Sequence, residues 1–286
     1  MSGPARLGLR AHLLAGHDGV VPPRPKWRTR MPAIIGGVMV LTMYVLGLAS
    51  LDIMPMRVLH GFWRLGDIAG MMLPPLPSNA ARFWIYLDAL GQTVAIALLG
   101  TLTAALFAVP LGFLAARNIV ANQAVHFLAR RVLDTVRSVD TLIWALIWIN
   151  VVGLGPFAGA LAIASADVCA LAKLMSEAIE TADRRPVEGV LTAGGSRLAA
   201  IRFGILPQIL PIFASQILYF IESNTRSATI IGIVGAGGIG LHLSEQIRVL
   251  EWQEAAFIIL LVLVAVVLID QISSQLRRML AGGRAG

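Results

Sequence analysis

The sequence predicts an all-helical integral membrane protein with about six transmembrane helices. Hydrophobic residues make up 57% of the 286-residue chain and charged residues only 14%, against about 25% charged residues in soluble proteins. Long apolar runs recur along the chain, and basic residues gather in alternate connecting segments. Apolar surface on this scale needs lipid to face, which argues against a soluble enzyme. The net charge of +7 is then explained by arginines kept on the cytoplasmic side rather than by nucleic-acid binding.

The N-terminal part predicts a tail, one span and an amphipathic segment. Residues 1–30 are rich in Pro, Gly and Arg and are expected to form a cytoplasmic tail. A first, uncleaved span is expected at about Ala33–Leu51. In Met56–Met72, charged residues recur among apolar ones at helical spacing, which is typical of a helix lying on the external membrane surface. We therefore assign residues 31–86 to the first transmembrane helix and this amphipathic segment.

Residues 87–280 are predicted to form a core of five further transmembrane helices. The expected spans are Gly91–Ala116, two within Ser138–Ala172, then Pro207–Val234 and Ala255–Leu276. The stretch Ser138–Ala172 is longer than the ~20 residues that one span needs, and Gly-Leu-Gly-Pro at its middle is a strong turn signal. With both termini inside, 18 of the 23 basic residues fall in cytoplasmic segments, as the positive-inside rule expects.

The sequence gives no catalytic or metal site. The lone cysteine, Cys169, lies in an apolar run, the five histidines have no ligand spacing, and there is no Walker A motif for ATP hydrolysis. A G-x-G-x-x-G pattern does occur, but a membrane helix rather than a strand precedes it, so we reject a dinucleotide site. We expect an outer glycine loop that permits tight backbone packing or a re-entrant turn. Its glycines are Gly235, Gly237, Gly238 and Gly240.

The most specific pattern lies in a polar segment at about residues 184–206. Here Glu188-Gly-Val-Leu-Thr-Ala-Gly194 is followed nine residues later by Gly204-Ile-Leu206-Pro207. This resembles the permease signature of ABC importers, E-A-A-x(3)-G-x(9)-I-x-L-P. The signature is matched at Glu188, Gly194, Leu206 and Pro207, and the departures are Gly189, Val190 and Gly204. Together with residues 93–101, 110–118, 152–159 and 234–240, the pattern is similar to phosphonate ABC importer permeases over about residues 73–280.

The resemblance implies a type I ABC importer permease fold in the bacterial cytoplasmic (inner) membrane, with both termini cytoplasmic. It implies a homodimer of permeases, two ATP-binding subunits on the cytoplasmic face and an extracytoplasmic substrate-binding protein, with ATP and Mg held by the ATPase. The expected cargo is phosphonate or a related phosphorus oxyanion, moved by alternating access. A short cytoplasmic coupling helix would contact the ATPase. The expected coupling residues are Arg184, Arg185, Glu188, Gly194, Leu206 and Pro207.

Polar residues at alternating steps of four and three predict a polar face on the fifth span. They are Ser215, Tyr219, Glu222, Arg226 and Thr229, with Thr225 beside them. A charge in the membrane costs about 2.5–3.5 kcal/mol on insertion scales, so this face should meet other helices or water. Two interpretations stay open. Arg226 attracts an anionic substrate along a translocation pathway, or the Glu222–Arg226 pair fixes helix packing.

Two other classes of function are kept as alternatives. A stand-alone secondary transporter or channel would use Glu222, Arg226 and Asp167 of the fourth span as coupling groups. A fixed negative charge at Asp167 would oppose an anionic cargo, so we assign it no substrate role. A membrane-embedded enzyme would need a convergent nucleophile or metal set, and the sequence offers none.

Overall fold

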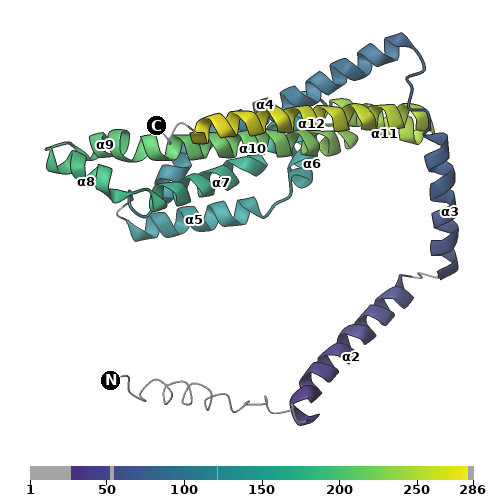
Figure 1. Cartoon of the computed structure of the whole chain (residues 1–286), viewed down its shortest axis with the longest axis horizontal. Coiled ribbons are helices and arrows are strands. Elements are labelled where there is room, and N and C mark those ends of the chain that lie inside the picture. Colours follow the sequence, from purple (N-terminus) through teal and green to yellow (C-terminus); the bar gives the residue numbers. More distant parts are fainter. Residues whose placement is uncertain (1–26, 52–54, 121, 283–286) are drawn as a thin grey trace, which may run out of the picture. The chain divides into compact units, whose positions relative to one another are not determined.

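The computed structural model describes residues 27–51, 55–120 and 122–282 (Figure 1). Contacts divide the chain into residues 1–66 and residues 67–286, which are described separately. The first unit contains α2, Trp27–Ser50, and most of α3, Pro55–Met71. The described side chains of α2 after Met31 are largely exposed and apolar, as expected of a helix that faces lipid.

The second unit is a helical bundle. Its elements are α4 Ala80–Ala115, α5 Gln123–Arg137, α6 Thr141–Val152, α7 Pro156–Thr181, α8 Arg184–Thr192, α9 Arg197–Ala200, the π-helical turn η1 Ile201–Ile205, α10 Leu206–Ile233, α11 Ile239–Arg248 and α12 Trp252–Gly282. All regular elements within the described residues are helices. Figure 1 shows α8 and α9 at one end of this bundle and α11 at the other.

Five helical stretches are long and apolar enough to cross a membrane, or six if α5 and α6 together make one broken span. The axes of α5 and α6 differ by 86°. The break has a local cause, because the Asp140 side chain accepts from the backbone N–H of Leu142 at 2.8 Å and starts a new helix. The 12 residues of α6 are about 18 Å long, less than the ~30 Å hydrocarbon core. The all-helical elements and the five or six apolar stretches together confirm the predicted all-helical membrane fold.

Several of the described helical stretches run beyond the spans expected from the sequence. Asn79 caps α4 by accepting from Arg82 N–H at 2.8 Å, so this helix starts well before the expected Gly91. The expected last span ends at the Arg277-Arg278 pair, yet α12 continues through it to Gly282. The stretch Arg197–Ile233 is 37 residues long, about 55 Å, so part of it extends beyond a ~30 Å hydrocarbon core.

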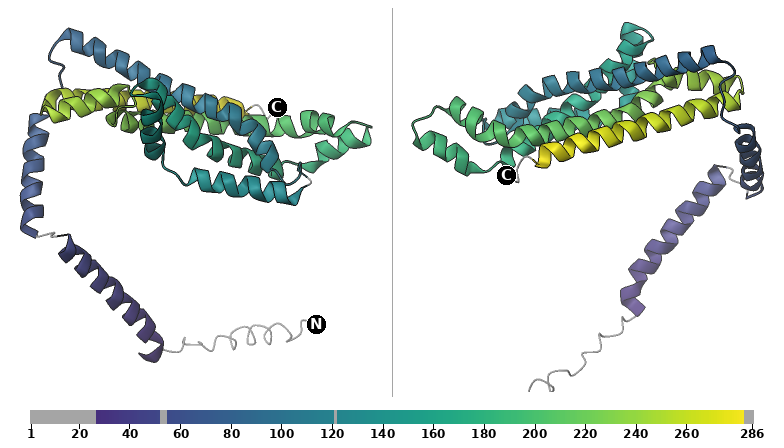
Figure 2. Two further views of the ribbon diagram at one scale, coloured as in Figure 1. Left: turned by 180° about the vertical axis from the view of Figure 1, so that it is seen from behind. Right: turned by 45° about the horizontal axis from the view of Figure 1, so that its top comes forward.

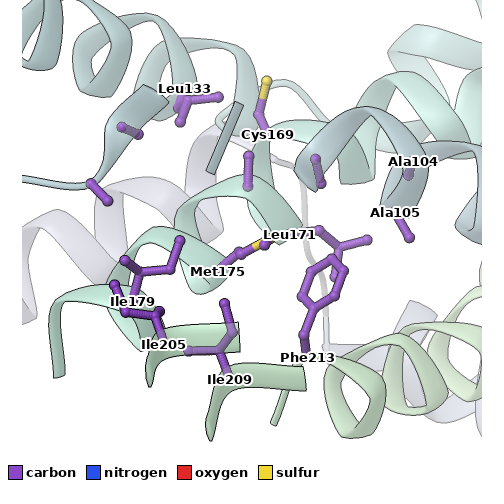
Figure 3. Close-up of a cluster of buried hydrophobic side chains, with 14 residues drawn as sticks. Ala104, Ala105, Leu133, Cys169, Leu171, Met175, Ile179, Ile205, Ile209 and Phe213 are labelled. Carbon is purple, nitrogen blue, oxygen red and sulfur yellow. The ribbon is translucent and has the colours of Figure 1, made fainter. Parts of the chain in front are cut away.

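The core is built from small side chains where α4 meets α7 and from larger ones near α8. Ala97, Ala104 and Ala108 of α4 are fully buried, and such small residues let membrane helices approach closely. Figure 3 shows the cluster nearer α8, where Met175 and Ile179 of α7 lie beside Ile205 and Ile209. This apolar packing anchors η1 and the start of α10. Because α8 contacts η1, the same packing positions α8.

Candidate functional site

The predicted coupling segment at about residues 184–206 folds as α8, α9 and η1, and α8 has a defined start and end. Asp183 caps its first turn, accepting from Arg185 N–H at 3.0 Å. At its end, Gly194 N–H donates to Leu191 C=O at 3.0 Å and Gly195 N–H to Val190 C=O at 2.9 Å, the two bonds of a Schellman motif. This motif needs a left-handed residue, and Gly194 has φ +84°. Gly194 therefore determines where α8 ends and the chain turns back.

α8 is seated closely on η1. A Cβ added at Gly204 would lie 2.9 Å from the Cα atom of Val187, closer than a Cβ atom normally comes to a neighbour. Gly204, one of the three departures from the importer signature, thus allows the two helices to touch. The side chain of Gln208 adds polar contacts, because it accepts from Asp183 N–H at 2.9 Å and donates to Asp183 C=O at 3.1 Å. Gln208, which was not predicted as a site residue, thus joins the start of α8 to α10.

Charged residues are exposed on α8. Arg184, Arg185 and Glu188 are exposed, as is Leu191 at 44%. An exposed mixture of charges around an apolar side chain is typical of a docking surface.

Leu206 and Pro207 begin α10 directly after the π-helical turn. Leu206 N–H donates to Ile201 C=O, five residues earlier, instead of the usual four. Proline lacks an N–H and its ring crowds the preceding turn, which is consistent with this wide turn at Pro207. The two signature residues thus lie where the chain passes from the α8 region into the long helix.

The five polar residues predicted to share one face of the fifth span, and Thr225 beside them, differ in exposure. Thr225 and Thr229 are buried, whereas Tyr219 is 53% exposed and the Arg226 side chain 58% exposed. Ser215 is half-buried and donates to Pro211 C=O at 2.8 Å. Only part of the predicted stripe is therefore accessible in a single copy of the chain.

Glu222 lies between two arginines. It is 3.5 Å from Arg226, one turn along α10, and 3.3 Å from Arg277 of α12. Helices α10 and α12 run side by side (Figure 2). Arg277 was expected in the C-terminal tail, so this second partner of Glu222 was not predicted. The Glu222 side chain is 14% exposed, and arginines from two helices compensate its charge, so removing either arginine would leave a poorly solvated carboxylate less well paired.

A buried polar cluster joins three helices in the bundle. Asn224 of α10 donates through Nδ2 to the carboxylate of Asp167 on α7 and to Thr101 Oγ1 on α4 at 2.8 Å. All three residues are less than a tenth exposed. The sequence analysis identified Asp167 but found neither partner. Buried polar groups need such partners to offset their desolvation, so the cluster explains how α7 tolerates an acid.

The glycine loop between α10 and α11 packs against neighbouring backbone. Gly235, Gly237 and Gly238 have positive φ angles of 104°, 81° and 72°. Gly235 C=O accepts from Gly155 N–H at 3.1 Å, and a Cβ at Gly237 would lie 2.8 Å from the nitrogen of Pro156. Such close approach excludes side chains. Gly240, the fourth predicted glycine of this loop, is buried at the start of α11.

A second buried cluster, also absent from the sequence analysis, lies at the α11 end. Glu254 of α12 is 1% exposed and accepts from the side chains of Arg82, Tyr86 and Ser78. Arg82 also donates to Gln246 of α11 at 3.2 Å. This cluster joins the starts of α4 and α12 to α11.

The fold that these elements form is that of a type I ABC importer permease. A chain from the MetNI methionine ABC transporter in inward-facing conformations covers 71% of this chain and 99% of its own length with a TM-score of 0.63, at 18% identity. A chain of an amino acid ABC transporter solved with histidines covers 71% with a TM-score of 0.57. At 18% and 14% identity, these likenesses show the fold alone.

Sequence comparison gives the family. Residues 108–282 match the family described as binding-protein-dependent transport system inner membrane component. The phosphite transport system permease protein PtxC of Stutzerimonas stutzeri is 37% identical over 86% of this chain and 87% of its own length. The phosphate-import permease protein PhnE of Mycolicibacterium smegmatis is 38% identical over 73% of this chain but only 39% of its own. The chain belongs to this family and is an integral inner-membrane permease subunit of an ABC importer.

Proposed function

We propose that the chain carries phosphonate, or a related phosphorus oxyanion, across the inner membrane as the permease subunit of an ABC importer. The observation that carries this proposal is the 37% identity with a phosphite permease over 86% of the chain. Phosphite, phosphate and phosphonate share a compact tetrahedral anion with several hydrogen-bond acceptors. A pathway for any of them needs the same donors and positive charge.

We infer that α8 docks on an ATPase subunit at the cytoplasmic face. Arg184, Arg185 and Glu188 would make polar contacts there, while the close packing at Gly204 and the bonds of Gln208 transmit movement of α8 to α10. The Schellman turn at Gly194 keeps α8 short and fixes its direction. ATP and Mg belong to that partner, and this chain supplies the moving membrane part.

Alternating access requires a second permease, identical or related, and an extracytoplasmic binding protein that delivers the substrate. ATP binding closes the ATPase dimer and turns the permeases outward, and hydrolysis returns them inward. Both termini of this chain lie in the cytoplasm in this arrangement. The exposed side chains of Tyr219 and Arg226 on α10 then face the space between the two permeases.

In that space Arg226 is the group that attracts the anion. Its guanidinium is held near Glu222, while Arg277 takes part of the Glu222 charge, so positive potential remains at the exposed side. Arg226 must bind the anion weakly enough for the anion to be released. The stand-alone transporter is less well supported, because Glu222 is already paired with two arginines and Asp167 with Asn224.

Reconstituted uptake tests the proposal. Proteoliposomes would contain the permease with its ATPase and binding protein, and uptake of radiolabelled methylphosphonate and phosphite would be followed with and without ATP. We expect ATP-dependent uptake of at least one of these anions, and a loss of at least tenfold in Arg226→Gln. The exposed Arg137→Gln variant, which makes the same charge change on α5, should retain uptake. Equal uptake without ATP or ATPase would instead favour a secondary transporter.

A further inference from the structure

A basic cavity lies at the α8 end of the bundle and shares Arg184 with the exposed surface of α8. Its volume is about 840 Å³, within the range of about 300–1,000 Å³ that is usual for small-molecule sites. It is formed where the end of α4, the start of α5, the end of α7 and the first residue of α8 meet. Its polar lining is Arg117, Asn118, Gln123, His126, Glu180 and Arg184.

The carboxylate in this cavity already has partners. Glu180 accepts from the backbone N–H of Arg117 at 2.8 Å and from Arg130 Nη2 at 3.0 Å. Asn118 is held as well, donating to Ile179 C=O at 2.9 Å. These contacts fix the loop after α4 and leave Glu180 neutralised by Arg130.

The positive groups of the cavity, in contrast, have no acceptor within the part of the chain that the structure describes. Among the described residues, neither the Arg117 nor the Arg184 guanidinium forms an ion pair or a side-chain hydrogen bond. His126 is 8% exposed, and its Nδ1 has no hydrogen-bond partner in the described part of the chain. The cavity also borders the start of α5, whose first backbone N–H groups are already capped by the Asn122 side chain. Two guanidinium forks and a buried imidazole together match a multiply charged oxyanion.

We propose that this cavity binds a phosphorus oxyanion, either a free phosphate or phosphonate or the headgroup of an anionic phospholipid. Arg117 and Arg184 hold the oxygens from two sides, and His126 contributes from the buried wall. Because Arg184 is the first residue of α8, a bound anion links α8 to the end of α4. The site differs from the proposed Arg226 pathway and needs neither ATPase nor binding protein to be occupied.

Binding to the full chain in nanodiscs tests the proposal and distinguishes the two sources. In discs of phosphatidylcholine alone, equilibrium dialysis with radiolabelled inorganic phosphate measures the free anion. In discs that also contain phosphatidylglycerol, native mass spectrometry measures the lipid that stays bound. The test variant is Arg117→Gln with Arg184→Gln, and Arg137→Gln is the control because it lies on α5 outside the cavity. Gln123→Glu, which adds a negative charge at the rim, tests the site while keeping both arginines.

Saturable phosphate binding that weakens at least tenfold in the double variant and in Gln123→Glu, but less than twofold in Arg137→Gln, supports a site for a free anion. Phosphatidylglycerol retained by the wild type and Arg137→Gln, but lost from the other two variants, supports a headgroup site. The proposal is overturned if neither ligand binds, or if Arg137→Gln loses as much binding as the cavity variants. Since no transport is measured, a failure here leaves the proposed function untouched.

Discussion

Replacing Gly204 by alanine should loosen α8 from η1 while leaving the exposed face of α8 unchanged. The added Cβ would lie 2.9 Å from both Cα and Cγ2 of Val187, and ordinary van der Waals separation begins at 3.4 Å. α8 must therefore retreat by about 0.5 Å, because the Cα atom of Val187 belongs to the backbone and cannot rotate away. Overpacking of this kind costs about 1–3 kcal/mol, partly offset by the gain of up to about 1 kcal/mol from replacing a helical glycine.

A matched control lies on α8 itself. A Cβ added at Gly189 meets nothing within 4 Å, so Gly189→Ala adds the same methyl group and should gain helix stability without a clash. A net loss near 1 kcal/mol at Gly204 corresponds to about a fivefold weaker docked state. Removing the Val187 methyl groups, as in Val187→Ala, should restore only part of the loss, because the clash with the backbone of residue 187 remains.

The assay is the number of substrate molecules transported per ATP hydrolysed in the reconstituted complex. We expect Gly204→Ala to lower this ratio about fivefold, while Gly189→Ala stays at the wild-type value or above it. Equal ratios for the two variants would refute the argument that the close packing of Gly204 against α8 transmits movement.

Three further changes test other parts of the structure by thermal unfolding in detergent. Gly237→Ala, which combines φ +81° with backbone and ring atoms at 2.8–2.9 Å, should lower the midpoint markedly. Asn224→Leu should lower the free energy of unfolding by about 1–3 kcal/mol, because the buried Asp167 loses its hydrogen-bond donor. Adding Asp167→Leu should recover part of this loss. If the effects of the two substitutions simply add, the coupling between the two residues is contradicted. Arg82→Ala should lower the stability of the folded chain more than Glu254→Gln, because it removes the cation from the 1%-exposed Glu254. The Arg82 side chain is 42% exposed, so water can hydrate it when Glu254 is replaced. The reverse order would be inconsistent with this explanation.

Local signals predicted much of the fold. Glycine and proline at positions 153–156 separated two helices as expected, because a positive φ at Gly153 and Gly155 cannot continue a helix. The end of α8 at Gly194 follows from the same property. The break between α5 and α6 also had a local signal, since Asp140 precedes an apolar run as helix-capping residues do. This capping signal was not used to place the break in the sequence-based spans.

The buried clusters could not be predicted in this way. Asn224 lies 57 residues from Asp167 and 123 from Thr101, and helical periodicity says only which side of a helix a residue occupies. The same holds for Glu254 with Arg82, 172 residues apart, and for Arg277 with Glu222. Gln208 was not predicted because a glutamine near a helix start has no distinctive sequence pattern. Its role depends on Asp183, which only the fold brings beside it.

The central claim, that α8 docks on an ATPase, is tested most directly by cross-linking. A cysteine at the exposed position Glu188 would carry a maleimide-benzophenone label in membranes that contain the whole importer, and Val249→Cys, exposed at the α11 end, serves as the control. The native Cys169 is buried and should not compete for label. We expect light to join the Glu188→Cys chain to the ATPase and the Val249→Cys chain to no ATPase. Cross-linking to the ATPase from Val249 alone, or from neither position, would contradict the proposed coupling.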